Sequence, residues 1–290
     1  MIDRKRVRHA FGKQAGEYES HASVQKRVLA RLVDILQGES LAPRRILDIG
    51  SGTGMLLRTL RGVYGDAWAV GVDHAVGMNI KARKCLGNDG RAHVLAADAE
   101  QLPFSPSSFD LVLSTSTFQW LEHPGVAFGE AFRVLVPGGL FCFALFGEGT
   151  LHELRNSYRY AAALNGGPEN RVHTFLTGKQ VASALRQAGF ASCRVTSRME
   201  VEFHENVPAL LRSLKRIGAG NASPVRGRGL AGKRTMLAMM ERYRHLYGGS
   251  NGIPASYEVI YGLGWKGGTA GEDIKQAIDF VFSLNDTGAT

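Results

Sequence analysis

The chain contains few cysteines and no familiar metal-binding spacing. Its three cysteines, Cys85, Cys142 and Cys193, are far apart and form no Cys-x-x-Cys pair. This pattern argues against a disulfide framework or a zinc site and indicates inert thiols. The nine histidines also lack a His-Glu-x-x-His pattern, so we assign no metal.

Long hydrophobic runs are absent as well. No apolar stretch approaches the roughly 18 residues that a membrane helix needs. The first residues, MIDRKRVRHAFGKQ, are basic, but the apolar core of a secretory signal does not follow them. We therefore expect a cytoplasmic protein without a membrane partner.

Acidic residues are outnumbered. The 290 residues carry 35 Lys and Arg against 26 Asp and Glu, which gives a net charge of +9. Such a basic chain favours anionic partners, namely nucleic acid, a membrane surface or an acidic protein, although a general solubility charge is the alternative. The length suits one large α/β domain, with or without an insertion.

The region from residue 44 to residue 146 alternates short apolar runs with longer amphipathic stretches. This pattern predicts βα units and a mainly parallel sheet. The strand-like runs are RRILDIG, AWAVGVD, AHVLAAD, FDLVLSTS and LFCFALFG, the last entered through a turn at VPGG. Apolar spacing over residues 22–37 predicts a helix before the first strand. Beyond residue 150, helical stretches surround two further strand-like runs, SCRVTSRMEVEF and YEVIYGLGW.

A glycine-rich loop follows the first strand in ILDIGSGTG, residues 46–54. Gly50 and Gly52 allow backbone amides to approach a ligand, and the helix that follows adds the positive end of its dipole. Asp48 precedes the first glycine, and the third glycine of the dinucleotide fingerprint is missing at its usual offset. Both features favour a ligand with an amino-acid moiety and no pyrophosphate.

Acidic residues also end the next two strands. Asp73 can accept hydrogen bonds from both hydroxyls of a ribose, and Asp98 with the following backbone amide can read an adenine edge. Each acid alone could instead be a turn former or a helix cap. Together they indicate a nucleoside-binding crevice at the carboxyl ends of the strands.

These ordered motifs, with RVLVPGG, resemble those of class I S-adenosylmethionine-dependent methyltransferases over roughly residues 40–146. The resemblance implies an α/β, Rossmann-like fold: a mostly parallel seven-stranded sheet, helices on both faces and a helical cap or insertion. It also implies S-adenosylmethionine as the cofactor. The residues it assigns to cofactor binding are Tyr18, Asp48, Gly50, Ser51, Gly52, Asp73, His74, Asp98, Ala99 and Ser114.

Segments outside this core resemble a narrower family, the malonyl-[acyl-carrier-protein] O-methyltransferases of biotin synthesis. They are AFGKQAGEYESHASVQKRV, STSTFQWLEHP, FGEGTLHELRNSY, HTFLTGKQVASALRQAGF, LRSLKRIGAGNAS and YEVIYGLGW. The chain departs from the family pattern in having Thr174 where arginine is frequent, GLGW near the end, and an extension after Lys266. The missing arginine weakens the assignment of a carboxylate clamp at residue 174.

The narrower resemblance implies methylation of the free carboxylate of a malonyl thioester. Tyr18, Gln119 and Trp120 would position the reactants, although Trp120 could also be a core residue. Three cations are candidates for binding substrate: Arg155, Arg212 and Lys215. Arg155 could alternatively lie on a solvated helix face. The implied partners are malonyl-loaded acyl-carrier protein or malonyl-CoA.

A basic stretch, LRSLKRIGAGN, begins a region of cations between residues 207 and 245 that only Glu241 opposes. It could bind the malonyl carboxylate, or it could face the phosphopantetheine phosphate or the acidic surface of the carrier protein at the rim of the site. The alternative is a solvated surface. Leu211, Leu214 and Ile217 are predicted to form its buried stripe.

Three other functions compete with this interpretation. A methyltransferase for a free small acid or another metabolite would need no carrier. A nucleic-acid methyltransferase would fit the basic charge, but STSTFQW stands where an NPPY-type motif is expected, so no nucleic-acid partner is predicted. A non-catalytic binding module is disfavoured by the intact cofactor motifs.

The expected organisation has four parts. They are an N-terminal helical lid at 1–40, a cofactor-binding core at 41–150, a segment at 151–266 that completes the sheet and carries a helical substrate-binding insertion at about 205–250, and a C-terminal extension at 267–290.

Overall fold

The computed structural model describes residues 3–88, 90–166, 175–219 and 230–267. The expectations for Thr174, for the part of the basic region at 220–229, and for the extension from residue 268 onward lie outside these residues. None of the helices in the described ranges combines the length and apolar character needed to cross a bilayer.

Seven strands form a single sheet in the order β3-β2-β1-β4-β5-β7-β6. The strands from β1 to β5 pair in parallel, whereas β7 runs antiparallel to both β5 and β6. The predicted, mostly parallel seven-stranded sheet is therefore confirmed. The strands are β1 (Arg45–Ile49), β2 (Trp68–Asp73), β3 (Ala92–Ala96), β4 (Phe109–Thr115), β5 (Leu135–Phe146), β6 (Ser192–His204) and β7 (Ile253–Trp265).

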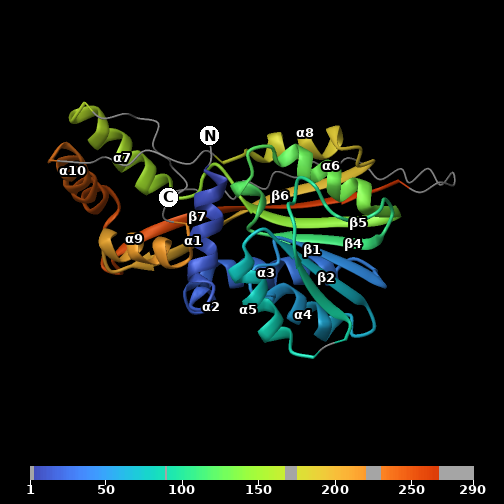
Figure 1. Cartoon of the computed structure of the whole chain (residues 1–290). Helices are drawn as coiled ribbons and strands as arrows, with labels where there is room; N and C mark the ends of the chain where they lie inside the picture. Colours follow the sequence, from blue (N-terminus) through green and yellow to red (C-terminus); the bar gives the residue numbers. More distant parts are fainter. Residues whose placement is uncertain (1–2, 89, 167–174, 220–229, 268–290) are drawn as a thin grey trace.

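Helices cover both faces of the sheet (Figure 1). On one face α3 packs on β4 and β5, while α4 and α5 pack on β2 and β3; on the other face α6 and α8 pack on β5, β6 and β7. Because side chains alternate along a strand, neighbouring residues of β1 enter different cores: Ile46 faces α3 and Leu47 faces the phenylalanine-rich layer under α6. These helices are α3 (Ser23–Gln37), α4 (Met55–Val63), α5 (Val76–Leu86), α6 (Pro124–Val134) and α8 (Gly178–Gln187).

The VPGG sequence does not form a separate turn before the fifth strand. Strand β5 begins at Leu135 and includes these residues. Phe109 of β4 pairs with Leu135 of β5, but the next pair is Leu111 with Leu140. Strand β5 therefore has extra residues between these two pairs, and they form a bulge. Gly138 takes a left-handed conformation there, with φ of 79°.

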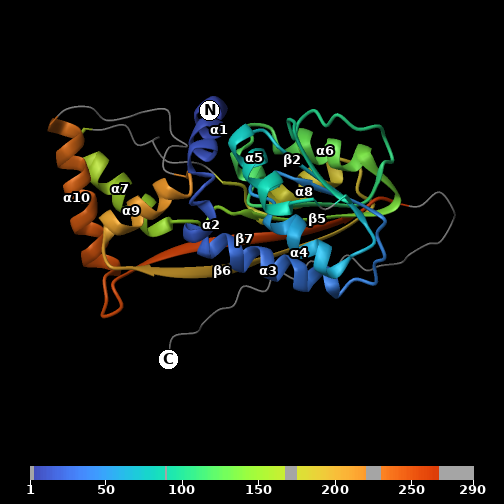
Figure 2. The ribbon, with the colours of Figure 1, turned by 60° about the horizontal axis from the view of Figure 1, so that its bottom comes forward.

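Helices α7, α9 and α10 gather at the end of the sheet where β6 and β7 extend furthest (Figure 2). Helices α7 and α10 pack side by side, and α9 contacts α10, α2 and β6. Helix α1 crosses in front of the carboxyl ends of the central strands and contacts α5. These helices are α1 (Arg4–Gln14), α2 (Tyr18–His21), α7 (His152–Leu164), α9 (Val207–Arg216) and α10 (Leu230–Tyr247).

Candidate active site

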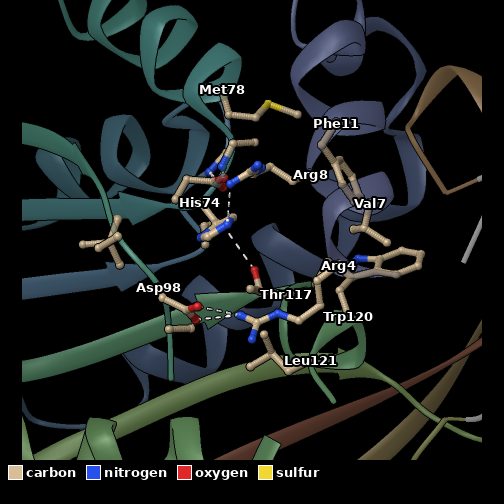
Figure 3. A pocket seen from close by; sticks show the side chains of 18 of the residues that line it. Arg4, Val7, Arg8, Phe11, His74, Met78, Asp98, Thr117, Trp120 and Leu121 are labelled. Carbon is tan, nitrogen blue, oxygen red and sulfur yellow. Dashed lines mark hydrogen bonds and ion pairs between the residues drawn. The ribbon is translucent and has the colours of Figure 1, made fainter. Parts of the chain in front are cut away.

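A pocket with about 830 Å³ of empty space, including its mouth, opens at the carboxyl ends of β1 to β4. The loops after these strands form its floor, and α1 forms its roof (Figure 3). Four residues of α1 line it at a spacing of i, i+3, i+4 and i+7, which is one helix face. They are Arg4, Val7, Arg8 and Phe11.

The glycine loop has the backbone that a bound ligand requires. Gly50 and Gly52 both have positive φ, at 76° and 54°, a region that other residues rarely adopt. A Cβ on Gly50 would lie 2.0 Å from the hydroxyl of Thr117, so only glycine fits. A Cβ on Gly52 would meet no protein atom within 4 Å, and Gly52 lines the pocket. The loop is therefore packed on one side and open toward the pocket on the other.

Asp48 is almost completely buried, at 1% exposure, and both of its carboxylate oxygens lack a hydrogen-bond partner in the described chain. Burial, and secondarily the nearby charge of Asp73, raises the pKa of Asp48 to about 8. A buried carboxylate without a partner is costly. A cationic group such as the ammonium of an amino-acid moiety would satisfy it, which is the kind of ligand that the sequence predicts.

Asp73 is held by the backbone at the end of β2. Its Oδ2 accepts the amide of Gly52 at 3.0 Å and its Oδ1 accepts the amide of Ala75 at 2.7 Å. Burial nevertheless raises the pKa of Asp73 above its ordinary value. Each carboxylate oxygen keeps a free lone pair, so the fixed side chain can accept two ribose hydroxyls, as predicted for this position.

Asp98 and Ala99 line the pocket beyond Asp73. Asp98 accepts the backbone amide of Glu100 at 3.0 Å and also pairs with Arg4. Burial acts to raise the pKa of Asp98, but these hydrogen bonds outweigh it and the net pKa is lowered. His74 also lines the pocket; its Nε2 lies 3.0 Å from Nη1 of Arg8.

Four of the predicted cofactor residues or positioners do not line the pocket, and Asp48, described above, is one of them. Ser114 is fully buried and its hydroxyl donates to the Ile49 carbonyl at 2.7 Å, which ties β4 to the end of β1. Gln119 is 6% exposed and donates Nε2 to the Ser116 carbonyl at 2.7 Å. Ser51 is buried in the glycine loop. Their direct contact with a ligand stays a prediction.

The pocket therefore fits S-adenosylmethionine in its donor set. The unpartnered Asp48 suits the amino-acid end, the open glycine loop suits close backbone approach, and Asp73 suits the ribose.

Comparisons with known proteins agree. Residues 47–143 match the family model described as a methyltransferase domain. The chain is also 52% identical over 265 residues to the malonyl-[acyl-carrier protein] O-methyltransferase of Geobacter sulfurreducens, covering 91% of this chain and 99% of that protein.

The chain belongs to the malonyl-[acyl-carrier protein] O-methyltransferase family. A second family member, from a Methylovorus species, is 36% identical over 277 residues, covering 92% of this chain and 90% of that protein. A methyltransferase structure from Thermotoga maritima has the same fold, with a TM-score of 0.52 at 20% identity, covering 89% of this chain and 99% of that chain. The protein is an O-methyltransferase that uses S-adenosylmethionine.

Three aromatic side chains line the mouth of the cofactor pocket. Phe11 of α1 meets Trp120 edge-on at 5.6 Å between ring centroids and lies 6.2 Å from Tyr18. Burial raises the pKa of Tyr18 well above its ordinary value, so its phenol stays neutral at physiological pH. The predicted positioners Tyr18 and Trp120 are thus brought together by Phe11, which forms a desolvated wall with them.

The three predicted substrate-binding cations lie on two different helices. Arg155 is on α7, half-buried, and donates Nη2 to the Glu148 carbonyl. Its Nε is buried without a partner within the described ranges. Burial, followed by the nearby charge of Arg159, lowers the pKa of Arg155. Arg212 and Lys215, on α9, are exposed.

The buried stripe of the basic helix α9 contains two of the three predicted residues, Leu214 and Ile217, with Leu210 in place of Leu211. Leu210, Leu214 and Ile217 are buried, at i, i+4 and i+7, whereas Leu211 is only partly buried. This spacing keeps the apolar side chains on one face of a 3.6-residue helix. All three cations of the stretch, including Arg216, are consequently exposed.

Sequence reasoning predicted an N-terminal helical lid but missed the residues by which α1 lines the pocket. Arg4, Arg8 and Phe11 line the pocket, yet they were not among the predicted site residues. Their spacing places them on one face of a helix, but the same spacing occurs in any short amphipathic helix. Only the folded chain shows that this face covers a pocket rather than the core.

Proposed function

We propose that this enzyme methylates the free carboxylate of a malonyl group carried on acyl-carrier protein, an early step of biotin synthesis, in the cytoplasm. The observation that carries the proposal is the likeness over nearly the whole chain to relatives named malonyl-[acyl-carrier protein] O-methyltransferase. The alternative is a methyltransferase for a free small acid or another metabolite, which would share the cofactor pocket.

The reaction requires that the carboxylate and the methyl donor be positioned and shielded from water, and it requires no general base. S-adenosylmethionine supplies an electrophilic methyl group: a carboxylate oxygen forms the new O–CH₃ bond as the S–CH₃ bond breaks and its electron pair returns to sulfur. The carboxylate is already ionised at pH 7. The neutral phenol of Tyr18 fits this chemistry, because no proton has to be removed. Opposite charges disappear in this step, so a water-poor pocket favours it.

Arg155 is the best-supported holder of the malonyl carboxylate. It follows β5, and its guanidinium is partly withdrawn from water without an ion pair to an acid in the described chain. The unpartnered Nε leaves one strong donor available. A carboxylate would satisfy this donor, because the Glu148 carbonyl occupies only Nη2 and the carboxylates of Glu148 and Glu258 act on Arg155 only as nearby charges.

Arg212 and Lys215 suit a different role, which is contact with the carrier protein. Both side chains are exposed and form no ion pair within the described residues. With Arg216 on the same helix and Lys233 and Arg234 exposed on α10, they make one end of the molecule strongly positive. Such a surface would steer an acidic carrier protein and respond to salt.

The test uses methyl-labelled S-adenosylmethionine with four separate acceptors: malonyl-acyl-carrier protein, malonyl-CoA, free malonate and tRNA. We expect label in the malonyl thioesters and the highest kcat/KM with the carrier protein. Absence of label from both thioesters would refute the proposal. Equal activity on free malonate would support the small-acid alternative, and label in tRNA would indicate a nucleic-acid substrate.

A further inference from the structure

Helix α1 is tied to the adenine end of the cofactor pocket by one arginine. Nη2 of Arg4 lies 2.7 and 2.8 Å from the two carboxylate oxygens of Asp98 (Figure 3). Nη1 of Arg4 lies 2.6 Å from Oε2 of Glu100. One guanidinium thus bridges two acids that belong to the loop after β3. One turn later on the helix, Arg8 contacts His74 after β2.

The rest of α1 packs on the surface of its neighbours. No residue of this helix is fully buried. Its apolar contacts are made mainly by Val7 and Phe11, which line the pocket, and Phe11 also packs on the small cluster of Ala15, Ala75 and Met78. Gly12 meets Gly77 of α5 through the backbone, since a Cβ on Gly77 would lie 2.5 Å from the Gly12 carbonyl oxygen. The closed position of α1 therefore depends heavily on its polar contacts at the pocket rim.

We propose that Arg4 is a latch that holds α1 closed over the cofactor pocket, and that breaking its pairs with Asp98 and Glu100 controls cofactor entry and product release. Asp98 is also the residue predicted to read adenine. Oδ1 of Asp98 already accepts Arg4 and the Glu100 amide, but Oδ2 keeps a free lone pair. The latch can therefore stay closed while a cofactor is bound. We expect it to change the rates of cofactor association and release rather than the Kd.

The latch is weak enough to open. The side chains of Arg4 and Asp98 are 32% and 31% exposed, and that of Glu100 is 16% exposed, so water and salt reach the pairs. A partly exposed two-acid network of this kind slows opening by roughly 5- to 30-fold. Loss of the latch should speed cofactor association and release by similar factors, and should change Kd by less than about 3-fold.

Trp120 provides the probe, because its ring contacts Phe11 of α1. The chain has three tryptophans, so Trp68→Phe with Trp265→Phe leaves Trp120 as a single reporter. In this background, stopped-flow fluorescence would follow S-adenosylhomocysteine binding, and its displacement by excess S-adenosylmethionine, without any methyl acceptor. The result is therefore independent of the proposed substrate.

The variant is Arg4→Gln, and the matched control is Arg6→Gln on the same helix, at a residue that does not line the pocket. Circular dichroism confirms that each variant is folded. We expect both rate constants to rise in Arg4→Gln and to stay unchanged in the control. Raising NaCl from 50 to 500 mM should speed release in the parent but not in Arg4→Gln.

Three outcomes would overturn the latch. Unchanged rates would mean that Arg4 does not restrain α1. Faster release with unchanged association, and hence a weaker Kd, would make Arg4 a direct cofactor ligand. Faster association with unchanged release would make it a simple competitor for Asp98.

Discussion

The buried carboxylate of Asp48 should make the stability of the cofactor-free enzyme fall as pH rises. Burial raises its pKa from 3.8 to about 8, so the folded state binds this proton more tightly than the unfolded state does. Stability is therefore lost between the two pKa values as pH increases. At about 1.4 kcal/mol per pH unit, the loss from pH 5 to pH 8 is on the order of 3 to 4 kcal/mol.

The perturbation is Asp48→Asn, which keeps the shape and removes the charge. The free energy of unfolding in urea, measured at pH 5, 6, 7 and 8 without cofactor, should exceed that of the parent by an amount that grows with pH. Taking this difference between variant and parent removes the contribution of Asp73, whose pKa is also raised. A difference that is constant over the four pH values would refute the reasoning.

The same substitution should have the opposite effect on ligand binding. If the carboxylate meets a cationic amino-acid moiety, the parent must release its proton on binding S-adenosylmethionine at pH 7. Calorimetric titration in buffers of different ionisation enthalpy should detect this proton in the parent and not in Asp48→Asn, whose Kd should be weaker. Equal proton release in the parent and in Asp48→Asn would mean that the cationic amino-acid moiety does not bind at Asp48.

The remaining predictions concern other parts of the site. Asp73→Ala should weaken S-adenosylmethionine binding by roughly 10- to 100-fold in an equilibrium titration, because two ribose hydrogen bonds are lost. Arg155→Gln should raise KM for malonyl-CoA and malonyl-carrier protein alike by roughly 10-fold or more, because a charge-assisted contact is lost, with cofactor Kd unchanged. Arg212→Glu with Lys215→Glu should raise KM for the carrier protein only, by roughly 10-fold at low salt and less at high salt.

Matched controls accompany the last two predictions. Arg159→Gln removes a neighbouring cation on the exposed side of α7 and should leave KM unchanged. Lys26→Glu with Arg31→Glu places the same charge change on α3, where both residues are exposed. Kinetics that are unchanged on reversing the α9 cations, or changed equally by the α3 reversal, would show that α9 does not contact the carrier protein.

The core fold followed from the sequence because its strands are long, apolar and ordered along the chain. Parallel strands end at one edge, so the positions of Asp48, Asp73 and Asp98 at successive strand ends were enough to assign them to one crevice. The VPGG stretch was harder to place, since Pro and Gly favour a turn and a bulge alike. Only the pairing of β5 with β4 decides between them.

The N-terminal lid was predicted, but the contacts that hold it over the site could not be predicted in the same way. Arg4 and Arg8 are as polar as any solvated helix face, and their partners, Asp98, Glu100 and His74, are more than 60 residues away. The buried stripe of α9 shows a related limit. Leu210 and Leu211 are equally apolar, and the packing against neighbouring helices selects Leu210.

The position of β7 has a consequence for how the chain is made. This strand comes last among those described, yet it lies between β5 and β6 in the sheet. Until Ile253–Trp265 leaves the ribosome, one edge of β5 has no strand to pair with, although most residues of β5 are buried in the folded protein. During this time β6 has no partner strand in the sheet. The sheet can close only when synthesis of its last strand is complete, and a nascent chain that stalls earlier exposes a long apolar edge prone to aggregation.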